Sequence, residues 1–199
     1  MSRRQAERSE HTRAALVRVA RELFTEPGYA ATPIEEVAER AGVTKGALYH
    51  HFRNKRDLFQ AVFEEIEQEL VTKVILAAGA AGDDVWKGMR LGVKAFLEAS
   101  LDASVGRIVL IDGPSVLGWD AWKEIDDRYG FEIVRGSLQA AVDAGIIAKR
   151  PVDPLARLFL AALSEAAIQI ARAPDQKRAM KEMTDAVQSL LDSMRVPSG

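Results

Sequence analysis

The sequence contains no cysteine among its 199 residues and only three histidines. The absence of cysteine excludes a disulfide framework, a thiolate zinc site and a cysteine nucleophile. No apolar run approaches the roughly 18 residues that a membrane-spanning helix requires. The charged N-terminus leads into no apolar segment of the kind that forms a secretory signal. We therefore expect a cytoplasmic protein that does not interact with membranes.

Catalytic constellations are also missing from the sequence. Aspartates in the second half are not accompanied by a nucleophile, a metal-binding cluster or a phosphate-binding loop, so we predict no enzyme, metal or cofactor. Aromatic residues amount to only 7%, whereas 48% of the residues are hydrophobic and 28% are charged. This composition and length predict a globular chain of one domain, or one domain with a small appendix.

Charge is distributed unevenly along the chain. Residues 1–56 carry eleven lysines and arginines against seven acidic residues, whereas the rest carries sixteen basic and twenty-two acidic residues. A basic head on an acidic body favours contact between the head and a polyanion.

The hydrophobic pattern is helical throughout. Residues 12–24 have the spacing of an amphipathic helix, with Ser9 as a plausible N-cap. Thr32 is expected to cap a second helix with Pro33 in its first turn, and Thr44 to cap a third. Asn54, with an aspartate three residues later, predicts the start of a fourth helix.

Further helices are predicted at about 84–103, 120–144, 153–172 and 175–194. The apolar run 105–111 is rich in β-branched residues, but the sequence offers it no partner strand. We interpret it as a short buried helix, followed by an irregular corner at residues 113–115. The fold class is therefore all-α.

Residues 33–51 predict two short helices joined by a sharp turn. Gly42 accepts the positive φ that such a turn requires, and Val37, Ala38, Val43 and Leu48 supply a small apolar core. This pattern is typical of a helix-turn-helix, whose second helix enters the major groove of DNA. A plain αα-corner without any DNA function is the alternative.

One run of residues resembles the DNA-binding head of the tetracycline-repressor (TetR) family. The run is Gly28 to Leu58, with Ala41-Gly42-Val43, Gly46, Leu48-Tyr49, Phe52 and Lys55 at the family's spacing, and the resemblance covers residues 9–60. It implies an all-helical homodimer of about nine helices per subunit. Residues 1–56 would form a three-helix helix-turn-helix domain, and residues 57–199 a helical bundle for ligand binding and dimerisation.

The resemblance also implies roles for individual residues of the head. Tyr49 and Lys55 are expected to contact phosphates of a double-stranded operator, as are Thr44 and His51. Lys45 and His50 are expected to reach bases, while Gly46 permits close approach of the helix.

Position 33 departs from the family, which commonly has serine or threonine there. Thr32 is expected to take over both the cap and the phosphate contact from Pro33. Arg3, Arg4 and Arg8 form a basic arm that either enters a minor groove or stays solvated.

The acidic body is expected to bind a small apolar or aromatic effector. For any single residue there, ordinary core packing is the alternative. The candidate lining residues, with Asp112 as a candidate polar anchor, are Trp86, Met89, Phe96, Ile108, Asp112, Trp119, Trp122 and Tyr129.

Apolar stripes on the last two helices predict the dimer surface, since a palindromic operator requires two-fold symmetry. Part of each stripe is expected to belong to the core. The candidates are Leu155, Phe159, Ala162, Leu163, Ala166, Met183, Val187, Leu190, Leu191 and Met194.

The sequence therefore predicts a ligand-responsive transcriptional regulator, a repressor released from its operator by a small molecule. Two alternatives stay open: a helical small-molecule-binding protein that never meets DNA, and a regulator that no longer responds to a ligand.

Overall fold

The computed structural model describes residues 3–196, with side chains from residue 5 onward. Within this range the chain forms ten α-helices, two π-helical segments and a single isolated bridge between Ile147 and Arg195. Several segments follow one another without a break, so the described chain contains nine continuous helical stretches. The all-α fold expected from the sequence is confirmed.

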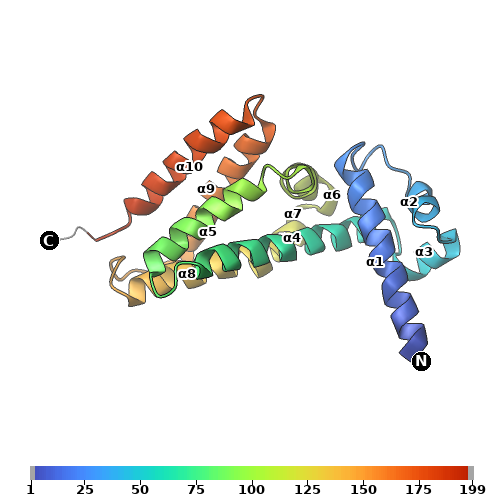
Figure 1. The fold of residues 1–199 in the computed structure, drawn as a ribbon, viewed down its shortest axis with the longest axis horizontal. Coiled ribbons are helices and arrows are strands. Elements are labelled where there is room, and N and C mark those ends of the chain that lie inside the picture. Colours follow the sequence, from blue (N-terminus) through green and yellow to red (C-terminus); the bar gives the residue numbers. More distant parts are fainter. Residues whose placement is uncertain (1–2, 197–199) are drawn as a thin grey trace.

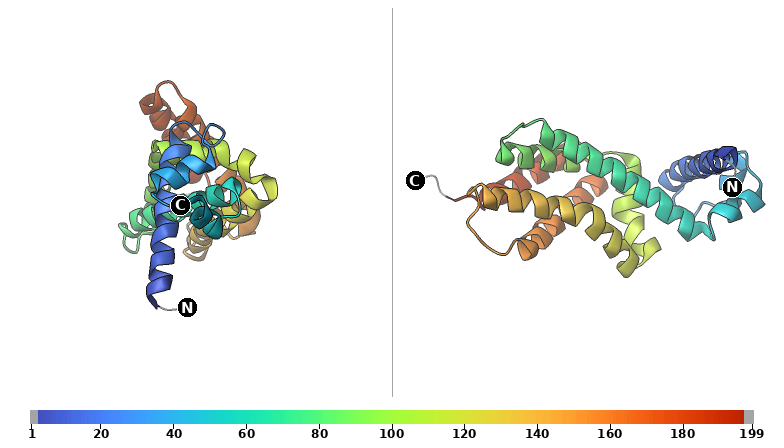
Figure 2. Two further views of the ribbon diagram at one scale, coloured as in Figure 1. Left: turned by 90° about the vertical axis from the view of Figure 1, so that its right-hand side faces the viewer. Right: turned by 90° about the horizontal axis from the view of Figure 1, so that it is seen from below.

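The N-terminal head consists of α1 (Arg3–Thr25), α2 (Ile34–Arg40), α3 (Lys45–His51) and the beginning of α4 (Lys55–Gly79). Helix α4 continues out of the head and into the body, as Figure 1 shows. The head lies at one end of an elongated molecule, and the described chain finishes at the opposite end (Figure 2). The expected boundary between residues 56 and 57 remains a prediction.

The body contains the remaining helices. Helix α5 packs against α4, and α9 contacts α10, α8, α5 and η1. The bounds are α5 (Val85–Ala99), η1 (Val105–Asp112), α6 (Gly113–Leu117), α7 (Trp119–Asp126), η2 (Asp127–Phe131), α8 (Glu132–Asp143), α9 (Val152–Arg172) and α10 (Gln176–Asp192).

Two local expectations were wrong. Helix α1 already begins at Arg3, so Ser9 lies inside it rather than at its cap. The corner expected at residues 113–115 is helical, because α6 continues directly from η1. The chain breaks instead at Gly118, whose φ of 75° is one that residues with a Cβ rarely adopt.

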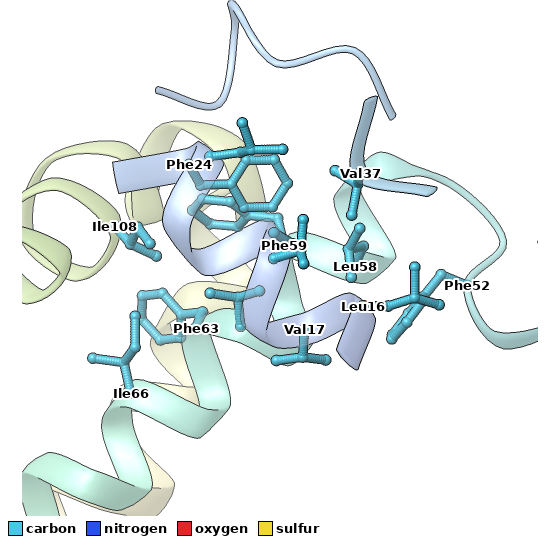
Figure 3. Close-up of a cluster of buried hydrophobic side chains, with 14 of the residues drawn as sticks. Leu16, Val17, Phe24, Val37, Phe52, Leu58, Phe59, Phe63, Ile66 and Ile108 are labelled. Atoms are coloured by element: carbon cyan, nitrogen blue, oxygen red, sulfur yellow. The ribbon is translucent and has the colours of Figure 1, made fainter. Parts of the chain in front are cut away.

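The head core joins the three head helices to the body. Leu16 and Phe24 of α1 pack with Phe59 and Phe63 of α4, and Ile108 of η1 closes the cluster from the body side (Figure 3). The rings of Phe24 and Phe59 lie 5.5 Å apart. The head is therefore packed against η1 of the body and shares a hydrophobic core with it.

A second core fills the far part of the body, between α5, α8, α9 and α10. Helix α9 is long and apolar enough to cross a membrane by length and composition alone, with a mean hydropathy of 1.3. Its packing against α5, α8, α10, η1 and η2 gives that composition an ordinary explanation. Most of its apolar side belongs to the body core.

Candidate nucleic-acid interface and ligand cavity

The turn between α2 and α3 has the geometry that the sequence predicts. Gly42 has a φ of 68°, and the amide of Val43 donates to the carbonyl of Ala38 at 3.0 Å. Val37 and Leu48 are fully buried between the two helices and α1. The two helices therefore form a compact unit that exposes the outer face of α3.

The first turn of α3 is fixed by Thr44. Its hydroxyl oxygen accepts a hydrogen bond from the amide of Ala47 at 3.1 Å, which confirms the expected N-cap. Lys45, Gly46, Tyr49 and His50 are all exposed on the helix that follows. These four residues and Thr44 define the α3 face.

Lys45 does not point freely into solvent in the unbound protein. Its Nζ lies 2.8 Å from a carboxylate oxygen of Glu35 on α2, and 5.9 Å from the centre of the Tyr49 ring. The hydrogen bond to Glu35 raises the pKa of Lys45, so the pair favours the charged ammonium. Because both partners are solvent-exposed, the pair is weak and easily exchanged for another anion.

Neither the packing around Gly46 nor its backbone conformation requires glycine at this position. A Cβ built there would meet nothing nearer than the Thr44 hydroxyl at 3.9 Å, and the backbone is helical. Glycine within a helix costs about 1 kcal/mol relative to alanine. The residue therefore lowers stability while leaving the surface of α3 flat at that point.

Lys55 is the first residue of α4, beside the α3 face. Its Nζ lies 4.3 Å from the centre of the Tyr29 ring, and partial burial lowers its pKa. The helix start is fixed by Asn54, whose side chain accepts from the amide of Asp57 at 2.9 Å, as predicted. Sequence reasoning did not single out Arg53, whose side chain is 90% exposed just before this cap.

The two histidines differ in their surroundings. His50 is exposed, whereas His51 is partly buried, and their rings meet edge to face at 5.4 Å. Burial, together with the charges of His50 and Arg13, lowers the pKa of His51. Among the described residues, no group of three or more acidic, histidine or cysteine side chains is arranged to hold a metal.

The role expected for Thr32 was wrong. Its side chain is buried, and its hydroxyl donates to the carbonyls of Leu23 at 3.1 Å and Gly28 at 2.9 Å. It therefore closes the loop between α1 and α2 and cannot face a phosphate. Pro33 occupies the N-cap position of α2 without a side-chain cap. Of the basic arm, the side chains of Arg3 and Arg4 lie outside the described part.

The body contains a cavity of about 580 Å³, partly open to solvent, between α4, α5, η1, α7, α8 and α9. Of the eight residues proposed as its lining, Met89 and Phe96 of α5 and Trp122 of α7 do line it. Aliphatic side chains from α4 and α9 supply much of the remaining wall. That these residues bind a ligand stays a prediction.

Two of the predicted tryptophans are not in the cavity wall. The Trp86 indole donates to a carboxylate oxygen of Asp192 at 3.2 Å, which ties α5 to α10. Trp119 is largely exposed and contacts Trp122, with ring centres 5.3 Å apart and ring planes tilted by 42°. The residue types in the sequence did not reveal which side of its helix each ring occupies.

Three further candidates also serve other purposes. Ile108 is fully buried in the head core, and Asp112 is paired with Arg107 at 3.1 Å. The Tyr129 hydroxyl accepts from the side-chain amide of Gln68 at 3.0 Å, so that it holds η2 against α4. These five corrections remove Trp86, Ile108, Asp112, Trp119 and Tyr129 from the cavity wall.

The cavity contains a buried carboxyl that sequence reasoning missed. Glu67 of α4 is only 8% exposed, and burial, with the nearby charge of Asp126, raises its pKa to about 8. The signal was present in the sequence, since Glu67 falls within the apolar stripe formed by Phe63, Ile66 and Leu70. A charged residue inside such a stripe indicates a polar site in the interior.

Three hydrogen bonds from arginine side chains join the head to the body. A guanidinium nitrogen of Arg56, in the first turn of α4, donates to the carbonyl of Leu117 at the end of α6. Arg21 of α1 donates to the Ser104 hydroxyl at 3.0 Å and to Glu69 at 2.8 Å. These contacts link the head directly to the segments around η1 and α6.

Half of the predicted dimer residues face the interior of the same chain. Phe159, Leu163, Ala166, Val187 and Leu191 are buried in the body core, so they are not free to contact a partner. Leu155, Ala162, Met183 and Met194 are partly buried. Leu190 is 44% exposed, and Leu158, which was not among the predicted residues, is 72% exposed.

A helix-turn-helix head packed on a helical body that contains an apolar cavity defines a DNA-binding regulator with a ligand-sized pocket. Comparison with known proteins agrees. The family described as "Bacterial regulatory proteins, tetR family" matches residues 16–62, and "Tetracyclin repressor-like, C-terminal domain" matches residues 86–194. The chain belongs to the TetR family of transcriptional regulators.

Individual relatives support this assignment. The chain is 32% identical to the Transposon Tn10 TetC protein of Escherichia coli over 142 residues, 69% of this chain and 67% of that protein. It is 36% identical to the transcriptional regulator TtgR of Pseudomonas putida over 112 residues, 54% of this chain and 52% of TtgR. A crystal structure of a TetR-family regulator from Pectobacterium atrosepticum covers all of both chains, with a TM-score of 0.85 and 32% identity.

Proposed function

We propose that the protein is a dimeric, ligand-responsive repressor that acts in the cytoplasm on a palindromic operator. An apolar small molecule in the body cavity would weaken its hold on DNA. The observation that carries the DNA-binding part is the α3 face, where a capped helix exposes Lys45, Gly46, Tyr49 and His50 together. The cavity carries the ligand-binding part.

The contacts divide into two kinds. Lys45 and His50 lie on the exposed side of α3 and are the candidates for base readout, with Lys45 leaving Glu35 when it meets a guanine. Tyr49, Thr44, His51 and Lys55 are the candidates for phosphate contacts, which position the head without reading sequence. Gly46 would allow the helix to approach the groove closely.

The Arg56–Leu117 contact suggests how a ligand would reach the head. Pro114 of α6 and Trp122 of α7 line the cavity on either side of Leu117. A ligand that displaces α6 or α7 would move the carbonyl to which Arg56 donates. Because Arg56 lies in the first turn of α4, that displacement would tilt the head and change the spacing of the two α3 helices.

Dimerisation would use the exposed sides of α9 and α10. These sides carry Leu158, Ala161 and Leu190, which the single chain leaves open to solvent. Two heads must reach successive major grooves about 34–36 Å apart, so a two-fold dimer explains the palindromic operator.

Fluorescence anisotropy with labelled DNA from beside the protein's own gene tests the proposal. Lys45→Ala should cost about 1–3 kcal/mol on the preferred site and relax preference at one symmetric pair of positions. Lys55→Ala should weaken binding to all sequences and lower the salt slope by about one unit. Lys149→Ala, an exposed lysine in the α8–α9 loop away from the head (Figure 1), is the control.

The results separate the alternatives. Wild-type affinity in both Lys45→Ala and Lys55→Ala would contradict the assigned contacts. Failure of the wild-type protein to prefer any DNA would favour a helical small-molecule-binding protein. Specific DNA binding that no cavity ligand changes would indicate a ligand-insensitive regulator.

A further inference from the structure

The charged side chains in the cavity wall are all acidic. They are Glu67 of α4, Asp84 at the N-cap of α5 and Asp126 at the end of α7. Among the described residues that line the cavity there is no lysine, arginine or histidine. An anionic ligand would find no positive partner in this wall, whereas a cation would find carboxylates.

Two of the three carboxyls, those of Glu67 and Asp126, lie near each other. Asp84 is exposed, and its carboxylate caps α5 by accepting from the amide of Lys87 at 2.9 Å. Asp126 accepts from Lys123 at 3.0 Å, but the same ammonium also binds Asp127 at 2.6 Å. Arg157 also binds Asp127, at 3.1 Å, so Lys123 and Arg157 together pair both aspartates. Among the described residues, Glu67 is the one of the three cavity carboxyls with neither a basic partner nor a helix cap to serve.

Glu67 is a buried polar group that has no partner among the described residues of its own chain. Within residues 5–196 its carboxyl makes no hydrogen bond and no ion pair, and the residue is only 8% exposed. An ionised carboxyl without a partner is costly in an apolar interior, so Glu67 holds its proton at neutral pH while the cavity contains no cation. Native proteins almost always give such buried polar groups a partner. Because this carboxyl borders a cavity, a molecule in the cavity is the natural source of its partner.

We propose that the cavity binds an elongated apolar organic cation, whose ammonium group lies beside Glu67 and Asp126, and that Glu67 releases its proton to solvent and becomes a carboxylate as the cation binds. The hydrocarbon part extends along α4 from Glu67 toward Gly79, a distance of about 18 Å at the rise of an α-helix. Trp122 and Phe96 in the same wall offer aromatic rings, whose faces attract alkylammonium groups. The proposal rests on the proposed function, because it names the chemical class of the effector.

Calorimetric titration of the full-length protein with three matched compounds tests the preference for a cation. The compounds are decyltrimethylammonium, 1-decanol and decanoate, which share a ten-carbon chain and differ in the charge of the head group. We expect decyltrimethylammonium to bind at least tenfold more tightly than decanol, and decanoate to bind most weakly. Concentrations stay below micelle formation.

Two glutamate variants separate the cavity carboxyl from a general charge effect. Glu67→Gln should weaken decyltrimethylammonium binding at least tenfold while changing decanol binding less than about twofold. Glu64→Gln makes the same substitution on the same helix but lies outside the cavity wall, so it should leave both affinities unchanged. Equal binding of cation and alcohol, equal losses in the two variants, or no binding by any of the compounds overturns the proposal.

Operator affinity measured on the same samples keeps the two proposals distinguishable. If the wild-type protein binds DNA specifically but shows no preference for the cation, the regulator assignment stands and the cation assignment fails. If binding of the cation depends on Glu67 but DNA is not bound, the regulator assignment fails and the cavity chemistry stands.

Discussion

Replacing Glu67 with glutamine should change how the stability of the protein depends on pH. Burial and the nearby Asp126 raise the pKa of Glu67 from 4.5 to about 8 in the folded protein. The unfolded chain has no such environment, so there the carboxyl titrates near its ordinary value. Between these two pH values the folded protein holds a proton that the unfolded chain has released.

The sign and size of the effect follow from linkage. Because the folded state binds more protons in this window, the free energy of unfolding falls as pH rises, by about 1.4 kcal/mol per pH unit for one group. Over the whole interval up to the pKa of about 8 the loss reaches about 5 kcal/mol. This is a ceiling, because water entering the cavity of about 580 Å³ would solvate part of the charge.

Urea unfolding at pH 5, 6, 7 and 8 measures the effect. Glutamine has the shape of a protonated glutamate, so Glu67→Gln and wild type should have similar stabilities at pH 5. At pH 8 the variant should be the more stable by several kcal/mol. The difference between the two proteins cancels most of the titration of His51 and other groups, which both contain.

Glu64→Gln is the control, because Glu64 lies on the same helix outside the cavity wall and its carboxyl already accepts from the Gln60 amide at 2.9 Å. Its stability should follow that of wild type at every pH. A difference between wild type and Glu67→Gln that stays constant from pH 5 to pH 8 would refute the reasoning. It would mean that Glu67 is ionised and compensated in the folded protein.

Three further substitutions test other parts of the structure. Gly46→Ala should raise stability by about 0.5–1 kcal/mol in thermal unfolding and weaken operator binding, and unchanged DNA affinity would show that the groove does not need a flat surface there. Leu190→Glu should dissociate the dimer in sedimentation while each chain stays helical by circular dichroism, whereas Leu76→Glu, an equally drastic change at an exposed position of α4, should leave the dimer intact. Arg21→Met removes hydrogen bonds from α1 to the segment before η1 and to α4, and should lower the free energy of unfolding by about 1–3 kcal/mol. Arg18→Met, whose ion pair is exposed, should cost less than about 1 kcal/mol, and equal losses would argue against a structural link at Arg21.

The sequence alone determined the local architecture of the head. Thr44 and Asn54 cap their helices through amides three residues further on, and Gly42 takes the positive φ of the turn. These features depend on residues within four positions of one another, so they can be predicted without knowledge of the fold. The same holds for the helical reading of residues 105–111, although the segment is a π-helix rather than an α-helix.

Only the tertiary structure decided which partner each side chain meets. Thr32 carries the residue type of a cap, yet it bonds inward because Leu23 and Gly28 present their carbonyls to it. An amphipathic stripe shows that a helix has a buried side, but not whether its own chain or a second copy covers that side. Phe159 and Leu191 are covered by their own chain, whereas Leu190 is left open.

The cavity shows the same division most clearly. The sequence contained the aromatic residues of the body, but their spacing did not separate Trp122, which lines the cavity, from Trp86, which bonds to α10. Glu67 was visible as a charge inside an apolar stripe, while its neighbour Asp126 lies 59 positions further along the chain. Only folding brings these two carboxyls to one wall, because long-range proximity depends on how α4 and α7 pack and not on the residues near either one.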